Sequence, residues 1–334
     1  MTNSEKQKQK VIVAMSGGVD SSVAAFLLQQ QGYEVLGCYL DNGLPGADAA
    51  KECAEVLKIP LTVVDIRTEL EAQVCAPFTA AYLRGETPNP CVLCNPLVKL
   101  PTLLREAESL GAEYIATGHY ARTEGGTLYQ GRAPNDQSYM LCRLRPSQVE
   151  RLLLPLGNYT KEQVRSLARQ RGLAVADKAA SMEICFIPDR DYARYIEHRG
   201  ITPPVGDFVY HGKTVGQHRG IHHYTLGQRR HLGIALGQRV YVSAIDSEKN
   251  TVTLSDDEEV WTDQIQLRDL SLLTEAACPF RCTARIRHSR NDSPACTVYE
   301  DGGVVFDSPV RAPTPGQACA LYDAERVIGG GWIE

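Results

Sequence analysis

The sequence has no long hydrophobic run, no leader-like start and no disulfide-like pattern of cysteines. No stretch of 18 or more apolar residues occurs, so no membrane-spanning helix is predicted. Residues 1–10 are polar and contain lysine; a signal peptide needs an apolar core, so we expect a short disordered tail. The 11 cysteines are odd in number and spread along the chain. This pattern favours a reducing, cytoplasmic location over a secreted disulfide framework.

Basic charge is also not in excess. The net charge of −5 over 334 residues argues against indiscriminate nucleic-acid binding. Residues 190–240, however, hold eight Lys or Arg against three Asp or Glu, whereas residues 246–275 hold nine acidic against two basic side chains. A local basic face can bind phosphates on a protein that is acidic as a whole. The length allows two or three domains.

The most informative stretch spans residues 11–23. Its first five residues are all apolar and three of them are β-branched, which predicts a buried strand, and Ser16-Gly17-Gly18 then predicts a tight turn before a helix. The first N–H groups of a helix lack partners, and two glycines allow an anion to approach the backbone closely. We therefore expect a phosphate site. It differs from the GxxxxGKS/T loop, since no Lys closes it; a Gly-rich turn with a Ser/Asp helix cap is the structural alternative.

Strands and helices alternate after this stretch. Strands are predicted at 34–40, 61–66 and 114–117, and helices at 47–57, 70–83 and 103–110, with a further helix near 159–168 that Thr160 caps. This order predicts a parallel sheet with helices on both faces. Ligands of such sheets bind at the carboxyl ends of the strands. The Gly17 loop, the Asp41 turn and residues 117–119 should therefore converge on one nucleotide pocket.

Two cysteine-containing segments suggest chemistry without defining it. Pro88 and Pro90 hold Asn89 extended, and Cys91 and Cys94 then form a CxxC. That motif fits half of a zinc site, a redox pair or part of a cluster ligand set, and no matching second pair follows. Cys185 lies in an apolar, strand-like run over 178–187, where a cysteine is usually inert core; a reactive role is the alternative. Cys278 and Cys282 are interpreted as ordinary core residues.

From residue 201 onward the pattern becomes β-rich. Short β-branched runs at 240–242 and 251–254 flank a hairpin loop at 246–250, and no long amphipathic helix is predicted after residue 199. We expect two small β domains, separated within the acidic stretch 256–263. Residues 216–233 are dense in Arg, His and Gly, and Arg281, Arg285, Arg287 and Arg290 cluster, with Arg285 and Arg287 on one side of a strand. These residues form either a solvated basic rim or phosphate contacts to a folded RNA.

Taken together, the motifs resemble those of the tRNA-specific 2-thiouridylases. They lie at residues 16–21, 87–95, 117–122, 136–139, 155–157, 184–186, 223–230 and 315–317; the first is similar to the SGGxDS loop of ATP pyrophosphatases. The resemblance implies an α/β catalytic domain with a doubly wound parallel sheet at 1–199, resembling the adenine nucleotide alpha hydrolases. A small central β domain at 200–258 and a C-terminal β-barrel-like domain at 259–334 would follow.

The resemblance also implies roles for individual residues. The nucleotide site would comprise Ala14, Met15, Ser16, Gly17, Gly18, Val19, Asp20, Ser21, Leu40 and Gly118. Asn89, Pro90 and Cys91 would contact the target base, and His119, Asn135, Asp136, Gln137, Arg229, Arg287, His288 and Gln317 would contact tRNA. Asp20 would be catalytic, Cys94 the nucleophile and Cys185 the persulfide carrier.

The implied reaction replaces the 2-oxygen of the wobble uridine of tRNA by sulfur, with ATP and Mg²⁺ and a persulfide-donating partner protein. ATP adenylates the uridine oxygen, and the Cys185 persulfide then delivers sulfur, with one or both thiols of depressed pKa. The target uridine must leave the anticodon stack to reach the site, and this unstacking costs a few kcal/mol. Alternatives are an ATP pyrophosphatase that amidates a small acid, and an RNA-binding protein without activity.

Several positions depart from the family pattern. Cys91 stands where many members have Asp, so Cys91, Cys94 and Cys185 form a candidate ligand set for a 4Fe–4S cluster; a persulfide route without metal is the alternative. Asn135 replaces a usual Lys and His288 a usual Tyr. Pro101 is unusual in a helix, and we expect it in the first turn.

Overall fold

The computed structural model describes residues 8–177, 184–288 and 293–334. The chain divides into two compact units. The first unit comprises residues up to 73, 93–182 and 325–327, and the second comprises 74–92, 183–324 and 328–334. The first seven residues of the tail expected at 1–10, the first part of the predicted strand at 178–187 and Arg290 lie outside the described residues. The last residue of that tail, Lys10, already belongs to a strand.

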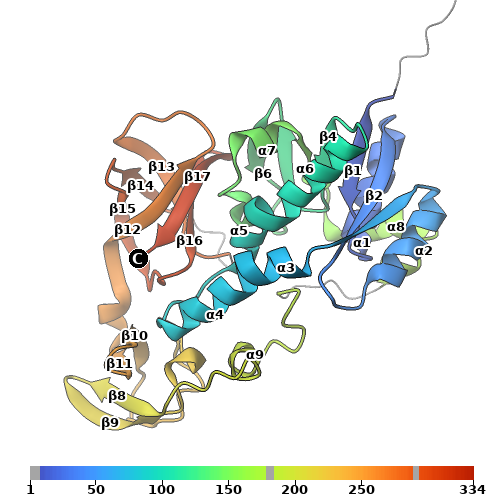
Figure 1. The fold of residues 1–334 in the computed structure, drawn as a ribbon. Coiled ribbons are helices and arrows are strands. Elements are labelled where there is room, and N and C mark those ends of the chain that lie inside the picture. The colour runs from blue at the N-terminus through green and yellow to red at the C-terminus, as the bar shows by residue number, and fades with distance from the viewer. Residues whose placement is uncertain (1–7, 178–183, 289–292) are drawn as a thin grey trace, which may run out of the picture. The chain divides into compact units, whose positions relative to one another are not determined.

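The first unit contains a parallel sheet of five strands in the order β3-β2-β1-β4-β7 (Figure 1). Its strands are β1 (Lys10–Ala14), β2 (Glu34–Asp41), β3 (Leu61–Asp65), β4 (Tyr114–Ala116) and β7 (Leu152–Leu153). All neighbouring pairs are parallel. The order places β1 in the centre, and the sheet confirms the fold class predicted from the alternation of strands and helices.

Helices cover both faces of this sheet because its strands are apolar on both sides. Alternate residues of β1, such as Val11 and Val13, pack in one core with α1 (Val19–Gln30), α2 (Ala47–Leu57) and α8 (Lys161–Gln170). Ile12 is buried from the other side, and α6 (Leu100–Ser109) contacts β1 and β4. The predicted cap of α8 is confirmed, since Thr160 Oγ1 accepts the Gln163 N–H at 3.3 Å.

Other elements of this part of the chain are short. The chain between β3 and α6 forms α3 (Arg67–Leu70), η1 (Glu71–Cys75), α4 (Ala76–Leu83), α5 (Pro90–Cys94) and η2 (Asn95–Lys99). Pro101 lies in the first turn of α6, as predicted. After β4 come β5 (Ala121–Glu124), β6 (Thr127–Gln130), η3 (Ser138–Leu141), α7 (Pro146–Glu150) and η4 (Ala174–Asp177).

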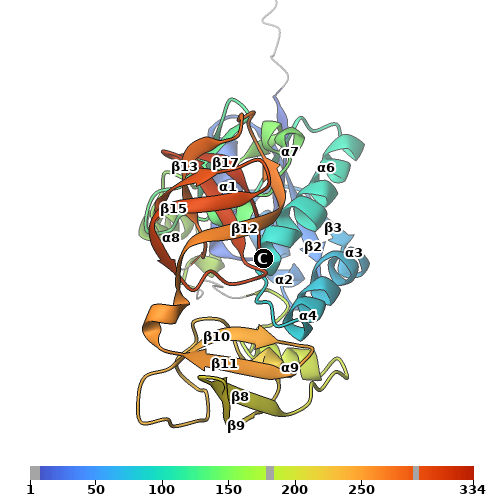
Figure 2. The same ribbon diagram turned by 90° about the vertical axis from the view of Figure 1, so that its left-hand side faces the viewer.

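The second unit contains a four-stranded sheet in the order β10-β11-β8-β9 (Figure 2). Its strands are β8 (Gly206–Tyr210), β9 (Lys213–His218), β10 (Tyr241–Asp246) and β11 (Thr251–Ser255). Phe208, Val242, Val252 and Leu254 form its core with Tyr224. The predicted hairpin loop is confirmed: β10 and β11 are antiparallel, and Asp246 Oδ1 accepts the N–H groups of Glu248 and Lys249. Short helices α9 (Tyr192–Glu197) and η5 (Ile221–His223) flank this sheet.

The remaining strands form a barrel, as expected for the C-terminal region. They are β12 (Trp261–Leu272), β13 (Phe280–Arg285), β14 (Ala295–Val298), β15 (Gly303–Arg311), β16 (Ala318–Asp323) and β17 (Arg326–Ile333). Because β12 pairs with both β15 and β17, the sheet closes into six strands and has no free edge there. The short helix η6 (Asp257–Val260) separates β11 from β12. The exact domain boundaries stay a prediction.

Three further findings complete the comparison with the sequence. Among the described helices, none has the length and apolar content that crossing a bilayer requires. All eleven cysteines are among the described residues, and none is joined in a disulfide. Cys282 is a core residue as predicted, 3.5 Å from Cys296 across the β13–β14 pair, whereas Cys278 is half-buried.

Candidate active site

The loop between β1 and α1 begins the site. Gly18 precedes α1 without a side-chain cap, so the first N–H groups of the helix point out of its end without an acceptor from the helix itself. Ser21 Oγ accepts the Ser16 N–H at 3.2 Å and lies 3.1 Å from Gly18 O. These bonds fold the loop back on the helix start. The helix dipole adds positive potential at this point, which favours a bound anion.

Two glycines are needed where backbone segments approach this loop. Gly17 has φ of +71°, and a Cβ on it would lie 2.8 Å from Gly46 O. A Cβ on Gly118 would lie 2.8 Å from Ser21 N and 2.9 Å from the carbonyl carbon of Asp20. Both contacts are with backbone, which cannot move aside as a flexible side chain does. The loop therefore packs between the start of α2 and the end of β4 only because both residues are glycine.

Tyr120 holds the carboxylate of Asp20. Its hydroxyl donates to Asp20 Oδ1 at 2.6 Å, and its side chain is fully buried. Burial, followed by the bond to Asp20, raises the pKa of Tyr120, so it stays a donor at neutral pH. The Lys161 ammonium lies 5.5 Å from the centre of its ring. Sequence reasoning missed Tyr120 and Lys161; the position of Tyr120 inside the motif at 117–122 was the available signal.

The three segments that were predicted to converge do lie at one edge of the sheet. The Gly17 loop follows β1, Asp41 ends β2, and Thr117 to His119 follow β4, all at the carboxyl edge of one parallel sheet. Asp41 Oδ1 accepts the Gly43 N–H at 2.9 Å, which makes the predicted turn. Thr117 Oγ1 lies 2.7 Å from His119 Nδ1. Burial lowers the pKa of His119 well below its ordinary value, so this imidazole is neutral at pH 7. Nucleotide binding at this edge stays a prediction.

Two of the residues that were expected to contact tRNA, Asp136 and Gln137, stabilise a loop of the first unit by hydrogen bonds. Asp136 Oδ1 accepts the N–H groups of Gly131 at 2.7 Å and Ser138 at 3.0 Å. The side-chain oxygen of Gln137 accepts the Tyr120 N–H at 3.0 Å. These bonds attach the loop to the residue that holds Asp20. Asn135 is half-buried, and its N–H donates to Arg132 O at 3.1 Å.

The CxxC motif lies on a short helix. Asn89 is outside the helix, as the two flanking prolines predicted, and α5 begins at Pro90. The Asn89 side-chain oxygen accepts the Cys91 N–H at 3.1 Å. Cys91 and Cys94 are both half-buried, and residues three apart on a helix share a face. The pair is therefore presented together by α5.

The interpretation of the segment around Cys185 as a strand was wrong for its described part. Residues 184–187 form a turn, in which the Ile187 N–H donates to Ile184 O at 3.0 Å. Ile187 is buried with Phe78 of α4, and Ile184 and Phe186 pack against the same cluster. Cys185 is exposed. The apolar residues thus anchor a turn and not a strand, and the thiol between them faces solvent rather than core.

The segment before Asn89 is tied down by residues far along the chain. The Thr87 N–H donates to Pro315 O at 2.8 Å, and Gln317 Nε2 donates to Thr87 O at 2.6 Å. Thr87 Oγ1 also lies 3.0 Å from Thr225 Oγ1. Thr87, the first residue of the motif at 87–95, therefore meets the motifs at 223–230 and 315–317 within the second unit. The sequence identified each motif but not this meeting, and it missed Thr87 and Thr225 as connecting residues.

Arg287 has a related role. Its guanidinium donates to Ala312 O, to Thr314 Oγ1 at 2.9 Å and to Leu226 O at 3.5 Å. These contacts join the loop after β13 to the motif at 223–230 and to the residues just before the motif at 315–317. The prediction that Arg285 and Arg287 share one side of a strand was wrong, because β13 ends at Arg285. Alternating spacing in the sequence could not show where the strand ended.

The other basic residues differ in exposure. Arg285 is buried, with its guanidinium 5.1 Å from the centre of the Tyr322 ring, so it does not belong to a solvated rim. Arg281 is exposed but paired with Asp307 at 2.6 Å. Arg229 is exposed and His288 half-buried. Of the residues expected to contact tRNA, Arg229 is thus the one presented most openly to solvent.

The fold and site together define a class of protein. The first unit is a parallel α/β domain with a loop suited to an anion, followed along the chain by two β domains. The family model described as tRNA methyl transferase HUP domain matches residues 9–189. The models described as tRNA methyl transferase PRC-barrel domain and aminomethyltransferase beta-barrel domain match residues 196–256 and 262–333. The class is thus a HUP-type domain with two appended β domains.

Comparison with curated proteins gives the family. The chain is 44% identical to the tRNA-specific 2-thiouridylase MnmA of Pelotomaculum thermopropionicum, covering 98% of each chain. It is 43% identical to the protein of the same name from Acetivibrio thermocellus, covering 98% of this chain and 99% of the relative. At this identity over nearly the full length, the chain belongs to the family of tRNA-specific 2-thiouridylases.

Proposed function

We propose that this protein replaces the 2-oxygen of the wobble uridine of tRNA by sulfur, at the expense of ATP. The observation that carries the proposal is the loop over residues 16–21 at the carboxyl end of the central strand, with Asp20 held by Tyr120. Full-length similarity to proteins named tRNA-specific 2-thiouridylases supports the choice of substrate. The alternatives, a small-acid amidating enzyme and an inert RNA-binding protein, are outcomes of the test below.

In the first step, the uridine 2-oxygen attacks the α-phosphorus of ATP. The bond between the α-phosphorus and the bridging oxygen breaks, and pyrophosphate leaves with the electron pair. The N–H groups at the start of α1 and the hydroxyls of Ser16 and Ser21 would stabilise the departing charge, because fixed donors need no reorganisation during the reaction. AMP is a far better leaving group than the original carbonyl oxygen. Adenylation therefore prepares C2 of the base for substitution.

In the second step, the terminal sulfur of a persulfide on Cys185 bonds to C2, and AMP leaves with the C–O electron pair. The Cys94 thiolate then attacks the Cys185 sulfur. The original S–S bond breaks, and its electron pair remains on the sulfur attached to C2. A Cys94–Cys185 disulfide results. A dithiol reductant must then supply two electrons to restore both thiols. The exposure of Cys185 on its turn supports the carrier role, since a donor protein must reach this thiol.

Two inorganic cofactors are part of the proposal. Mg²⁺ bound with ATP would neutralise phosphate charge, and Asp20 offers a carboxylate oxygen of the kind that it prefers. Cys91 and Cys94 share a face of α5, which suits two ligands of a 4Fe–4S cluster, with Cys185 as the third. If the cluster forms, anaerobically purified protein should contain about four irons per chain and lose them in a Cys91→Ser variant. Iron below one equivalent per wild-type chain would favour the route without metal.

The remaining assignments concern partners and location. We assign tRNA contacts to Arg229 and His288, and contacts with the target base to Asn89, Pro90 and Cys91, which follow closely on Thr87 and its bond from Gln317. A persulfide-donating protein would load Cys185. The predicted domain limits of 1–199, 200–258 and 259–334 and a cytoplasmic location belong to the same proposal.

The test uses full-length protein with unmodified tRNA and ATP. Wild-type protein should release pyrophosphate in a manner stimulated by tRNA. Asp20→Ala should abolish this release and leave tRNA binding intact, and Asp48→Ala, which removes an exposed acid from α2, serves as the control. Stimulation by a small acid instead of tRNA would favour the amidating enzyme. Binding of tRNA without any release of pyrophosphate would favour the inert protein.

A further inference from the structure

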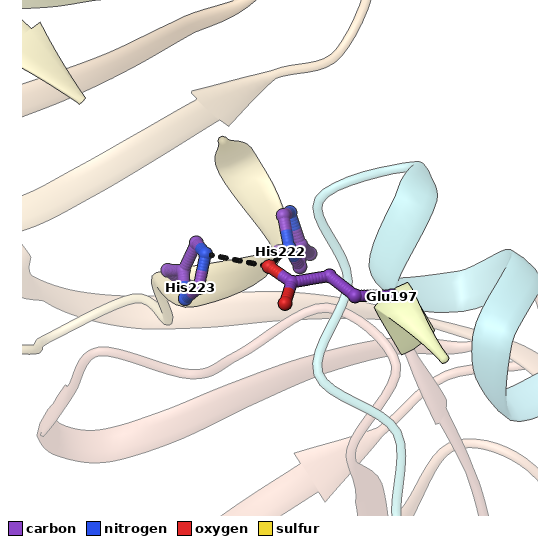
Figure 3. Close-up of side chains that lie close together, drawn as sticks. All are labelled: Glu197, His222 and His223. Carbon is purple, nitrogen blue, oxygen red and sulfur yellow. Dashed lines mark hydrogen bonds and ion pairs between the residues drawn. The ribbon is translucent and has the colours of Figure 1, made fainter. Parts of the chain in front are cut away.

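Two imidazoles and a carboxylate converge in the second unit. Glu197 ends α9, and His222 and His223 belong to η5. The Nε2 atoms of His222 and His223 lie 3.2 and 3.3 Å from Glu197 Oε1 (Figure 3). The three ligand atoms all lie within 4.8 Å of one another. Neither adenylation nor sulfur transfer, as proposed above, gives these residues a role.

The distances fit a shared metal ion. Zinc binds imidazole nitrogen and carboxylate oxygen at about 2.0–2.2 Å, so neighbouring ligand atoms around it lie roughly 3.0–3.4 Å apart for octahedral to tetrahedral angles. Both observed N···O separations fall in that interval. The same separations lie at the long end of the N–H···O hydrogen-bond range, which is about 2.7–3.2 Å. One carboxylate oxygen also faces both imidazoles, as it would when all three atoms share a cation.

Burial limits which nitrogen of His222 can reach a ligand. The His222 side chain is fully buried, and its Nδ1 has no hydrogen-bond partner among the described residues. A Cβ on Gly220 would lie 2.8 Å from this Nδ1, so the backbone closes that side and Nε2 is left to reach a ligand. The side chains of His223 and Glu197 are 12% and 36% exposed. Solvent can therefore supply the ligands that the three side chains do not.

The charges around the cluster are mixed. The carboxylates of Glu197 and Asp191 attract a cation bound beside His223, whereas the guanidinium of Arg219 repels it. The two histidines and one carboxylate form an N/O ligand set, which suits zinc and related divalent transition metals better than the all-oxygen set of Mg²⁺ or Ca²⁺.

We propose that Glu197, His222 and His223 bind one divalent transition-metal ion, zinc by chemical preference, with water completing its coordination. The ion would fasten the end of α9 to η5. Ile196 of α9 packs in the same cluster as Ile187, next to the turn that presents Cys185. The metal would thus secure the helix that follows the exposed thiol.

The test is a cobalt titration, followed by zinc competition, of tag-free full-length protein after removal of metals by a chelator. Cys91, Cys94 and Cys185 are replaced by Ser in every sample, because thiolates also bind these ions. Glu197→Gln is the decisive variant: its amide oxygen still accepts hydrogen bonds from both imidazoles but is a poor ligand. His223→Ala removes a second ligand. His211→Ala is the matched control, because it removes a His near a carboxylate, Asp256 at 3.5 Å, outside the cluster.

We expect one cobalt per chain, with visible bands of N/O coordination and without a sulfur-to-cobalt charge-transfer band. Glu197→Gln and His223→Ala should weaken binding at least about 100-fold, since even the loss of an outer partner costs about 10- to 100-fold in affinity. His211→Ala should bind as the parent protein does. Circular dichroism checks that each variant is folded. Absence of binding at micromolar metal, or equal affinity of the parent and Glu197→Gln proteins, would overturn the proposal.

Discussion

Removing one oxygen atom from Tyr120 tests whether the hydrogen bond that this residue donates orients Asp20 at the start of α1. In Tyr120→Phe the ring remains in its buried position, but the donor 2.6 Å from Asp20 Oδ1 is lost. Hydrogen bonds to charged groups contribute about 1.5–3 kcal/mol. If the proposed adenylation needs the orientation that this bond enforces, kcat/KM for ATP should fall about 10- to 150-fold, because about 1.4 kcal/mol is a factor of ten.

The assay is tRNA-dependent release of pyrophosphate, measured as a function of ATP concentration. Tyr129→Phe provides the matched control, since Tyr129 is a half-buried tyrosine of β6 in the same unit. Its variant should keep the parental kcat/KM. Circular dichroism and thermal unfolding show whether Tyr120→Phe remains folded at the assay temperature. A folded Tyr120→Phe protein with parental kcat/KM would refute the positioning role of Tyr120.

Three further predictions follow from the site. In Gly118→Ala the new Cβ would meet Ser21 N at 2.8 Å; overpacking costs about 1–3 kcal/mol, so pyrophosphate release should fall about tenfold or more, and parental release would show that the loop tolerates the shift. Arg229→Ala should weaken tRNA binding and reduce the magnitude of the slope of log K against log salt concentration by about 0.7–0.9. Lys249→Ala, on the hairpin loop, should change neither the affinity nor the slope. An unchanged slope for Arg229→Ala would remove Arg229 from the interface. Burial lowers the pKa of His119, so as the pH falls the unfolded chain takes up the proton before the folded protein does. The free energy of unfolding should therefore fall below about pH 6.5, by at most about 1.4 kcal/mol per pH unit from this group. Denaturant unfolding between pH 7.5 and 5.5 should show a shallower decline for His119→Gln than for the parent protein, and an equal decline would contradict the lowered pKa.

The local features of the fold were predictable because their causes are local. The apolar run at 11–15 and the following glycines define the strand, loop and helix start without reference to other residues. Thr160 is recognisable as a cap because its partner, Gln163, is three residues away. The order of strands and helices was sufficient to predict a parallel sheet. Such a sheet brings Asp41 and Gly118 to the edge that holds the Gly17 loop.

What the sequence did not reveal depends on distant residues. Tyr120 and Asp20 are 100 positions apart, and Gln317 holds Thr87 across 230 positions. Hydrophobicity alone also misled around Cys185, because Ile187 is buried, and Ile184 partly buried, by packing a turn against a cluster that includes Phe78. An apolar run shows that side chains are buried but not which backbone conformation buries them.

The most direct test of the account is mass spectrometry of the nucleosides from unmodified tRNA after incubation with the protein, ATP, and a cysteine desulfurase with free cysteine as the persulfide source. The account predicts exchange of one oxygen for sulfur in the wobble uridine, strictly dependent on ATP and abolished in Asp20→Ala and in Cys185→Ser. Full thiolation by the Cys185→Ser protein, or by the wild-type protein without ATP, would contradict it.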